Sequence, residues 1–208
     1  MSFSVRLSVG VLTVCLLVIV LSLEAQTAMN VQTTEILARA RQYAELRWTP
    51  TPQNVAAGCI PGYRSNFAPG VEQKGEPYRW GGSDTPAEFI AKLNRGLAAG
   101  AHAQHHENPR QPCTAGTDCS GFVCNVWNHA HLWTGDFGRI TTVLPDVSSM
   151  HTGDAFLKKG SHVILFIDFR EDGTLLLHEA AGARVHEVKG ADWGYVQDYV
   201  PVRYINIQ

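Results

Sequence analysis

The fold of this chain is indicated most clearly by the stretch Thr117-Asp118-Cys119-Ser120-Gly121-Phe122-Val123. Its first two residues are of types that cap helices, and the apolar residues from Phe122 onward recur at helical spacing. The pattern predicts a buried helix with Cys119 in its first turn, where free backbone N–H groups and the helix dipole stabilise a thiolate. A lone cysteine in a helix is more often a packing residue. With a base nearby, however, a thiol at this position is a nucleophile.

Two further motifs flank this stretch. Pro77-Tyr78-Arg79-Trp80-Gly81-Gly82 lies upstream, and Gly153-Asp154 followed by His162-Val163 lies downstream. In this order the three elements resemble the NlpC/P60 family of papain-like cell-wall cysteine peptidases. The resemblance spans residues 77 to about 180, roughly half of the chain.

The resemblance implies an α+β fold of the papain-like NlpC/P60 type, in which N-terminal helices, one of them carrying the nucleophile, pack against an antiparallel sheet. It implies that Cys119 is the nucleophile and His162 its base, and that Tyr78, Asp118 and Ser120 bind the substrate. The expected activity is hydrolysis of amide bonds in peptidoglycan stem peptides, of the D-γ-glutamyl–diamino acid endopeptidase type. Such a reaction needs no cofactor and no metal.

A third residue has to orient the base, and the sequence offers two neighbours, His178 and Glu179. Adjacent residues of a strand point to opposite faces, so only one of them can share the face of His162. A two-residue turn at Asp172-Gly173 would select Glu179, and a three-residue loop over 171–173 would select His178. The Asp-Gly dipeptide and the match of Glu-Ala to the family's His-Ala favour Glu179.

Helix signals elsewhere fit the same fold class. An apolar stripe behind a capping threonine predicts a helix over residues 35–48. Thr85, with Glu88 closing a capping box, predicts a second helix that ends at Gly100. This second helix belongs to an insertion at about residues 83–116, which departs from the family pattern and is expected to shape the substrate groove.

The last third of the chain changes to strand periodicity. Strands are predicted at 162–169, 174–180, 183–188 and 199–205, and Pro201 favours a sheet edge for the last of them. Helices first and an antiparallel sheet second make an α+β domain. Because no repeat or second module is visible, residues 26–208 are predicted to form one catalytic domain.

Residues 1–25 differ from the rest. Arg6 precedes an uninterrupted apolar run from Leu7 to Leu23. This pattern predicts a signal peptide, hence a secreted or periplasmic protein with no stable membrane association after cleavage; an uncleaved anchor is the alternative. In an oxidising compartment Cys59 and Cys113 are candidates for a disulfide.

Composition excludes some functions and leaves others open. A net charge of −2 gives no reason to expect nucleic acid as a partner, and the chain is expected to be a monomer that binds peptidoglycan peptides. His102, His105 and His106 precede Cys113, but their spacing matches no zinc motif, so no metal site is predicted. The alternative functions are a papain-like amidase or acyltransferase acting on another amide or ester, and a non-catalytic wall-binding protein of the same fold.

Overall fold

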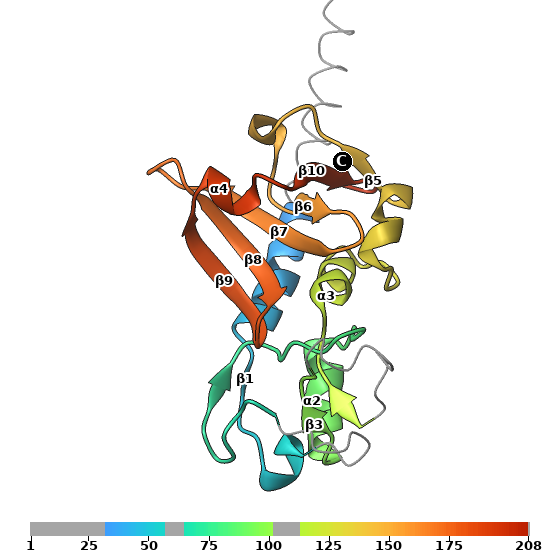
Figure 1. Ribbon diagram of the computed structural model, residues 1–208, viewed down its shortest axis with the longest axis vertical. Helices are drawn as coiled ribbons and strands as arrows, with labels where there is room; N and C mark the ends of the chain where they lie inside the picture. Colours follow the sequence, from blue (N-terminus) through green and yellow to red (C-terminus); the bar gives the residue numbers. More distant parts are fainter. Residues whose placement is uncertain (1–31, 57–64, 102–112, 208) are drawn as a thin grey trace, which may run out of the picture.

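The computed structural model describes residues 32–56, 65–101 and 113–207 of the 208-residue chain. A helix over residues 32–44 opens this part and runs beside the main sheet (Figure 1). The α-helices and strands that follow are, in chain order, β1 (Arg47–Trp48), β2 (Gln73–Lys74), α2 (Pro86–Asn94), β3 (Ala98–Ala99), β4 (Thr114–Ala115), α3 (Cys119–Val126), β5 (Thr141–Val143), β6 (Ala155–Lys158), β7 (His162–Phe169), β8 (Leu175–Ala181), β9 (Arg184–Ala191), α4 (Trp193–Val196) and β10 (Val200–Tyr204). Short 3-10 helices cover Pro52–Val55, Thr134–Arg139 and Val147–Ser149.

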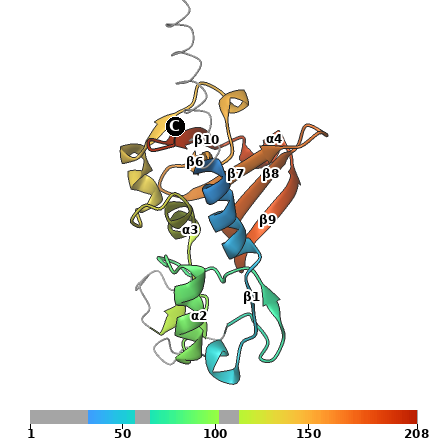
Figure 2. The ribbon, with the colours of Figure 1, turned by 180° about the vertical axis from the view of Figure 1, so that it is seen from behind.

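The main sheet has six strands in the order β5-β10-β6-β7-β8-β9, and each neighbouring pair is antiparallel. The helix over residues 32–44 and α3 lie on one face of it, as Figures 1 and 2 show from opposite sides. Burial of apolar side chains holds these layers together, and alternate strand residues supply the two faces. The core on the helical face includes Ile36, Ala40, Phe122, Val123, Val163 and Leu165. The core on the opposite face includes Phe156, Ile164, Phe166, Leu177 and Val196. Helices combined with an antiparallel sheet are compatible with the predicted α+β class.

A smaller core lies at the lower end of the molecule in Figure 1. Trp48 packs edge to face on Phe67 and Phe89, with ring centroids 4.9 and 5.1 Å away. The indole Nε1 of Trp48 donates a hydrogen bond of 2.9 Å to the carbonyl oxygen of Gly75. Alanines of the parallel pair β3–β4 complete this core. The described part of the 83–116 insertion therefore folds together with the segment before the Tyr-x-Trp-Gly-Gly turn.

The first predicted helix forms with different ends. It occupies residues 32–44 rather than 35–48, because Trp48 belongs to the smaller core and leaves the helical path. Arg47 and Trp48 instead form β1, which pairs with β2.

The helix α2 begins as predicted. Thr85 and Glu88 form the capping box, in which each side chain accepts a hydrogen bond from the other residue's backbone N–H. The predicted end at Gly100 is wrong, since the helix stops at Asn94. Gly96 there takes a φ of +84°, a left-handed conformation that glycine adopts at little cost and that ends helices.

The predicted strands are present, but the edge position of Pro201 is wrong. The strand β10 lies between β5 and β6. The carbonyl oxygen of Pro201 accepts a hydrogen bond from the N–H of Leu144, just after β5 ends at Val143. The N and C=O of one strand residue point to the same side, so the missing N–H of Pro201 faces the end of β5. The proline is tolerated there because it removes no bond to β6.

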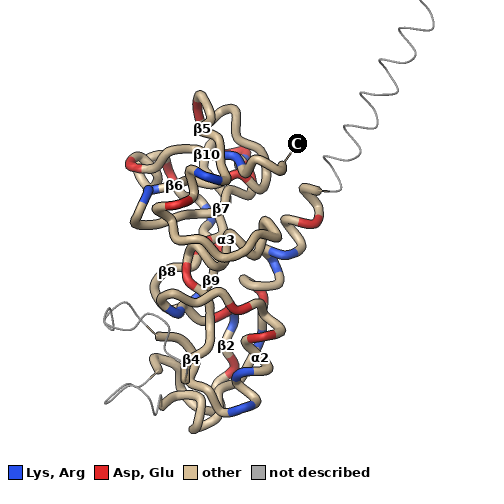
Figure 3. The backbone as a smooth tube through the Cα atoms, turned by 90° about the vertical axis from the view of Figure 1, so that its right-hand side faces the viewer, with Lys and Arg blue, Asp and Glu red and all other residues tan. Residues whose placement is uncertain are grey.

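Several predictions fall outside the described residues: the signal peptide over 1–25, the histidines at 102–106, and Cys59. Cys113 is disulfide-bonded, whereas Cys119 and Cys124 are free thiols. Within the described ranges no helix has the length and apolarity needed to cross a bilayer. Figure 3 shows acidic and basic residues interspersed along the described chain.

Candidate active site

The helix α3 begins where it touches the Tyr-x-Trp-Gly-Gly turn. Asp118 is its N-cap: Oδ1 accepts from the N–H of Gly121 at 2.7 Å, and Oδ2 accepts from the N–H of Gly81 at 3.0 Å. A Cβ on Gly121 would lie 2.1 Å from the carbonyl oxygen of Gly82, so only glycine permits this approach. Cys119 is the first residue of α3, as predicted, and its N–H has no partner within the helix.

His162, the first residue of β7, contacts both Cys119 and Glu179. Its Nε2 lies 2.6 Å from Oε1 of Glu179, and the Cys119 thiol is close enough to act on the charge of the ring. Burial alone would lower the pKa of His162, but the interactions with Cys119 and Glu179 outweigh it and raise the pKa to about 9. Burial alone would raise the pKa of Glu179, but hydrogen bonds from His162 and Tyr195 hold it below its ordinary value. At neutral pH an imidazolium therefore faces a carboxylate.

The hairpin register that brings Glu179 to His162 differs from the predicted one. The turn is a three-residue loop over 171–173: the N–H of Arg170 donates to the carbonyl oxygen of Thr174, and Gly173 has a φ of +79°. By itself this loop would have brought His178 to the face of His162.

A β-bulge reverses that outcome. The pairing of β7 with β8 shifts by one residue between Phe166 and Asp168. Ile167 is the extra residue, and its carbonyl oxygen accepts a hydrogen bond from Oγ1 of Thr152 instead. Beyond the bulge Leu165 pairs with His178, so Glu179 shares the face of His162. Glu179 was the favoured residue, but the two-residue turn used to select it was wrong.

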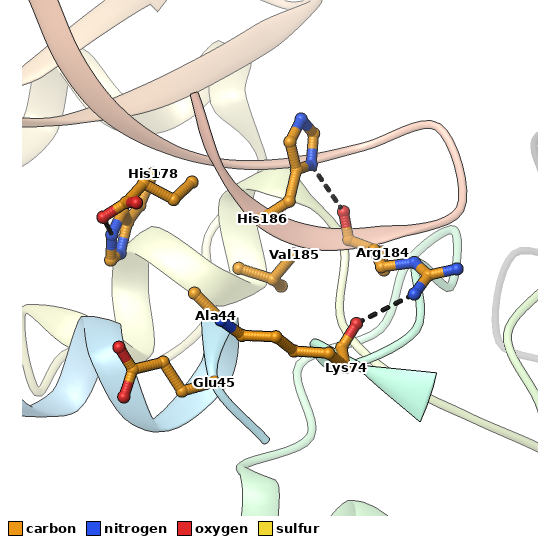
Figure 4. Close-up of a pocket in the computed structure, with 8 residues that line it drawn as sticks. Ala44, Glu45, Lys74, His178, Arg184, Val185 and His186 are labelled. Carbon is orange, nitrogen blue, oxygen red and sulfur yellow. Dashed lines mark hydrogen bonds and ion pairs between the residues drawn. The ribbon is translucent and has the colours of Figure 1, made fainter. Parts of the chain in front are cut away.

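His178 lies on the opposite side of β8. It is 2% exposed, and its Nε2 is 3.5 Å from Oε2 of Glu187, its cross-strand partner. Figure 4 shows His178 in a separate pocket of about 340 Å³, to which Lys74 and Arg184 also contribute. Burial lowers the pKa of His178, which keeps the ring neutral. Nothing in this placement links it to Cys119.

A second pocket, of about 300 Å³, opens beside the nucleophile. Its lining includes the three residues predicted to bind substrate, and the set is Tyr78, Trp80, Gly81, Asp118, Cys119, Ser120, His131, Trp133, Thr134 and Ser161. Burial, and then the charges of Cys119 and Asp118, raise the pKa of Tyr78, so its phenol stays protonated. No described residue of the 83–116 insertion lines this pocket, although the insertion was expected to shape the substrate groove.

The carboxylate of Asp118 is already engaged inside the protein. Besides its two backbone donors, Oδ1 accepts from Oγ of Ser120 at 2.8 Å. Nε2 of His131 lies 3.1 Å from the same hydroxyl and 3.5 Å from Oδ1. His131 and the 62% exposed Trp133 therefore stand at the mouth of the pocket. Sequence reasoning missed both, because they lie in an irregular segment without a motif.

The Gly153-Asp154 motif stabilises the main sheet and contributes no side chain to the site around Cys119. Asp154 is fully buried, and both its oxygens bind Arg203 of β10, at 2.8 and 2.7 Å. Oδ2 also accepts from the N–H of His151. This bidentate pair joins β6 to β10 and fixes the strand that precedes His162.

Comparisons with family models, curated proteins and solved structures find no match. A thiol beside an imidazolium, with a carboxylate behind the ring, can attack a carbonyl carbon and protonate the leaving group. Within the described residues no cluster of three or more His, Cys, Asp or Glu side chains is arranged to hold a metal ion.

Proposed function

We propose that the protein is an exported cysteine peptidase with an NlpC/P60-like fold, which hydrolyses amide bonds in peptidoglycan stem peptides. The observation that carries the proposal is the row of Cys119, His162 and Glu179, in which the ring of His162 interacts with the thiol and lies 2.6 Å from Oε1 of Glu179. The order thiol, imidazole, carboxylate is the arrangement that nucleophilic acyl transfer requires. Export is supported by the apolar run of residues 7–23.

The reaction starts from a thiolate–imidazolium pair. The sulfur of Cys119 attacks the scissile carbonyl carbon, and the oxyanion that forms faces the Cys119 N–H at the positive end of α3. When the C–N bond breaks, His162 gives its proton to the leaving amine and a thioester remains on Cys119. A water molecule then attacks the thioester, with His162 taking its proton. This step releases the acid and restores the thiolate–imidazolium pair.

The substrate class rests on the sequence motifs, and the pocket is compatible with it. The pocket beside Cys119 has aromatic walls from Tyr78, Trp80 and Trp133. Its polar side chains include Ser120 and His131, which contact each other. Aromatic walls with a few fixed polar groups suit a short, polar peptide. The bond expected to be cut lies between a D-γ-glutamyl residue and a diamino acid.

Digestion of purified peptidoglycan tests this proposal. The protein lacking residues 1–25 should release peptides whose masses place the cut at the D-γ-glutamyl–diamino acid bond. Cys119→Ala should release none, whereas Cys124→Ala, which removes the other free thiol of the described chain, should cleave normally.

Other outcomes would replace the proposal. Release of fragments cut at another amide would assign a different amidase. Release that persists in Cys119→Ala would refute the cysteine mechanism. Binding to peptidoglycan without any release would favour the non-catalytic reading.

A further inference from the structure

The carboxylate of Glu179 has a second contact that the reaction described above does not use. Oε1 faces Nε2 of His162 at 2.6 Å, and Oε2 accepts a hydrogen bond from the hydroxyl of Tyr195. Tyr195 belongs to α4, the short helix between β9 and β10 (Figure 1). The phenol hydroxyl and the carboxylate therefore extend the row that starts at Cys119 by one member.

We propose that Tyr195 is a positioning residue of the active site, whose hydroxyl fixes the carboxylate of Glu179 so that Oε1 points at His162. A glutamate side chain has three rotatable bonds, and one contact to a histidine does not fix them all. A second hydrogen bond to the other oxygen removes this freedom. The phenolic proton stays on Tyr195 throughout the reaction, so no proton or electron is transferred through it.

The backbone of Tyr195 is held independently of this contact. Asp192 caps α4, and its Oδ1 accepts a hydrogen bond of 3.1 Å from the N–H of Tyr195. Val196, the next residue, is buried in the core on the face opposite α3. The hydroxyl is therefore brought to Glu179 by a fixed element, even though the whole residue is 44% exposed.

The hydrogen bond from Tyr195 to Glu179 is important because the carboxylate that accepts it is buried. Glu179 is only 4% exposed, and a buried carboxylate oxygen without a donor is costly. Burial, together with the negative charge of Glu179, keeps Tyr195 protonated by raising its pKa, so it remains a donor at any pH used in an assay. The other titratable groups near Glu179 are His186, its cross-strand partner on β9, and Tyr199. Around the ring of His162 lie Cys119 and the edge of Tyr199.

The inference rests on the proposed function, and its test separates the two. Tyr195→Phe keeps the ring and removes the hydroxyl. Because Oε1 of Glu179 is then no longer held toward the ring, the carboxylate stabilises the imidazolium less, and the pKa of His162 should fall. NMR titration of the ring protons of His162 should show this fall, and the alkylation rate of Cys119 should rise only at a higher pH than in the unmodified protein, because a less stable imidazolium stabilises the thiolate less. For the hydrolysis itself we expect kcat to drop about tenfold with KM little changed, the size of one hydrogen bond to a charged group.

Trp193→Phe is the matched control, since this 49% exposed residue lies in the same short helix and is not a member of the row from Cys119 to Tyr195. It should leave the His162 titration and kcat unchanged. If Tyr195→Phe lowers the thermal midpoint but leaves the titration of His162 and kcat unaltered, the proposal is overturned and Tyr195 is a structural residue. If the unmodified protein cleaves no peptidoglycan, the proposed function fails, yet the NMR titration still decides whether Tyr195 acts on His162 through Glu179.

Discussion

At the scale of single residues, Glu179 and His178 are both almost fully buried, but they face opposite sides of β8. Glu179 contacts His162 and Tyr195, whereas His178 faces Glu187. A carboxylate behind the imidazole fixes the ring's orientation and stabilises its charged form. The buried side chain of His178 instead lines the separate pocket of Figure 4.

This difference predicts a contrast between neighbouring alanine variants. Glu179→Ala should lower kcat by about a hundredfold or more, because His162 loses the group that orients it. His178→Ala should leave kcat within about threefold and mainly lower the thermal midpoint, since it removes a buried side chain. Steady-state kinetics on a soluble stem peptide measures both. Equal losses of kcat in the two variants would show that Glu179 does not orient His162.

At the scale of elements, the strongest sequence signals were local ones. The caps of α2 and α3 could be predicted because each depends on residues three apart. The register of the β7–β8 hairpin could not, because its bulge depends on Thr152, which lies in another segment. For the same reason Tyr195 and His131 were missed: they reach the site only through the fold, and neither stands in a recognisable motif.

The approach of α3 to the Gly-Gly turn gives the prediction at this scale. Gly121→Ala places a Cβ against the carbonyl oxygen of Gly82, which should cost about 1–3 kcal/mol of stability and displace Cys119. Gly138→Ala is the control, because a Cβ there meets nothing within 4 Å. Thermal unfolding and hydrolysis rates measured on both proteins should separate them. A Gly121→Ala protein as stable and active as the control would mean that the close approach is not required.

At the scale of the whole molecule, Glu76 lies where the smaller core meets the main sheet. Its N–H donates to Tyr43 in the first helix, and its carbonyl oxygen accepts from Val185 in β9. The side chain is fully buried, and neither carboxyl oxygen has a hydrogen-bond partner among the described residues. Burial, followed by the charges of Asp84 and Glu88, raises its pKa well above the ordinary value.

This buried carboxyl predicts how stability depends on pH. In the unfolded chain Glu76 ionises near its ordinary pKa, whereas in the fold it holds its proton to higher pH. The folded state therefore loses stability as the pH rises above about 4.5, up to the raised pKa. Glu76→Gln should remove this loss, so it should raise the thermal midpoint more at pH 7.5 than at pH 4. Glu45→Gln, at an exposed position, should change neither midpoint. A gain in Glu76→Gln that is the same at both pH values would contradict a protonated Glu76.

Selective alkylation tests whether Cys119 is a nucleophile that His162 activates. The two free thiols of the described chain serve as target and internal control: Cys119 lines the open pocket, whereas Cys124 is fully buried and burial raises its pKa to about 11. Iodoacetamide at pH 6.5, followed by mass mapping of the labelled peptide, reports the rate at each cysteine.

We expect Cys119 to be labelled much faster than a small free thiol at pH 6.5, and Cys124 not to be labelled. The advantage of Cys119 over a free thiol should be lost in His162→Ala and should decline above about pH 9, where His162 gives up its proton. If Cys119 is labelled no faster than a free thiol, or equally fast in His162→Ala, His162 does not activate Cys119.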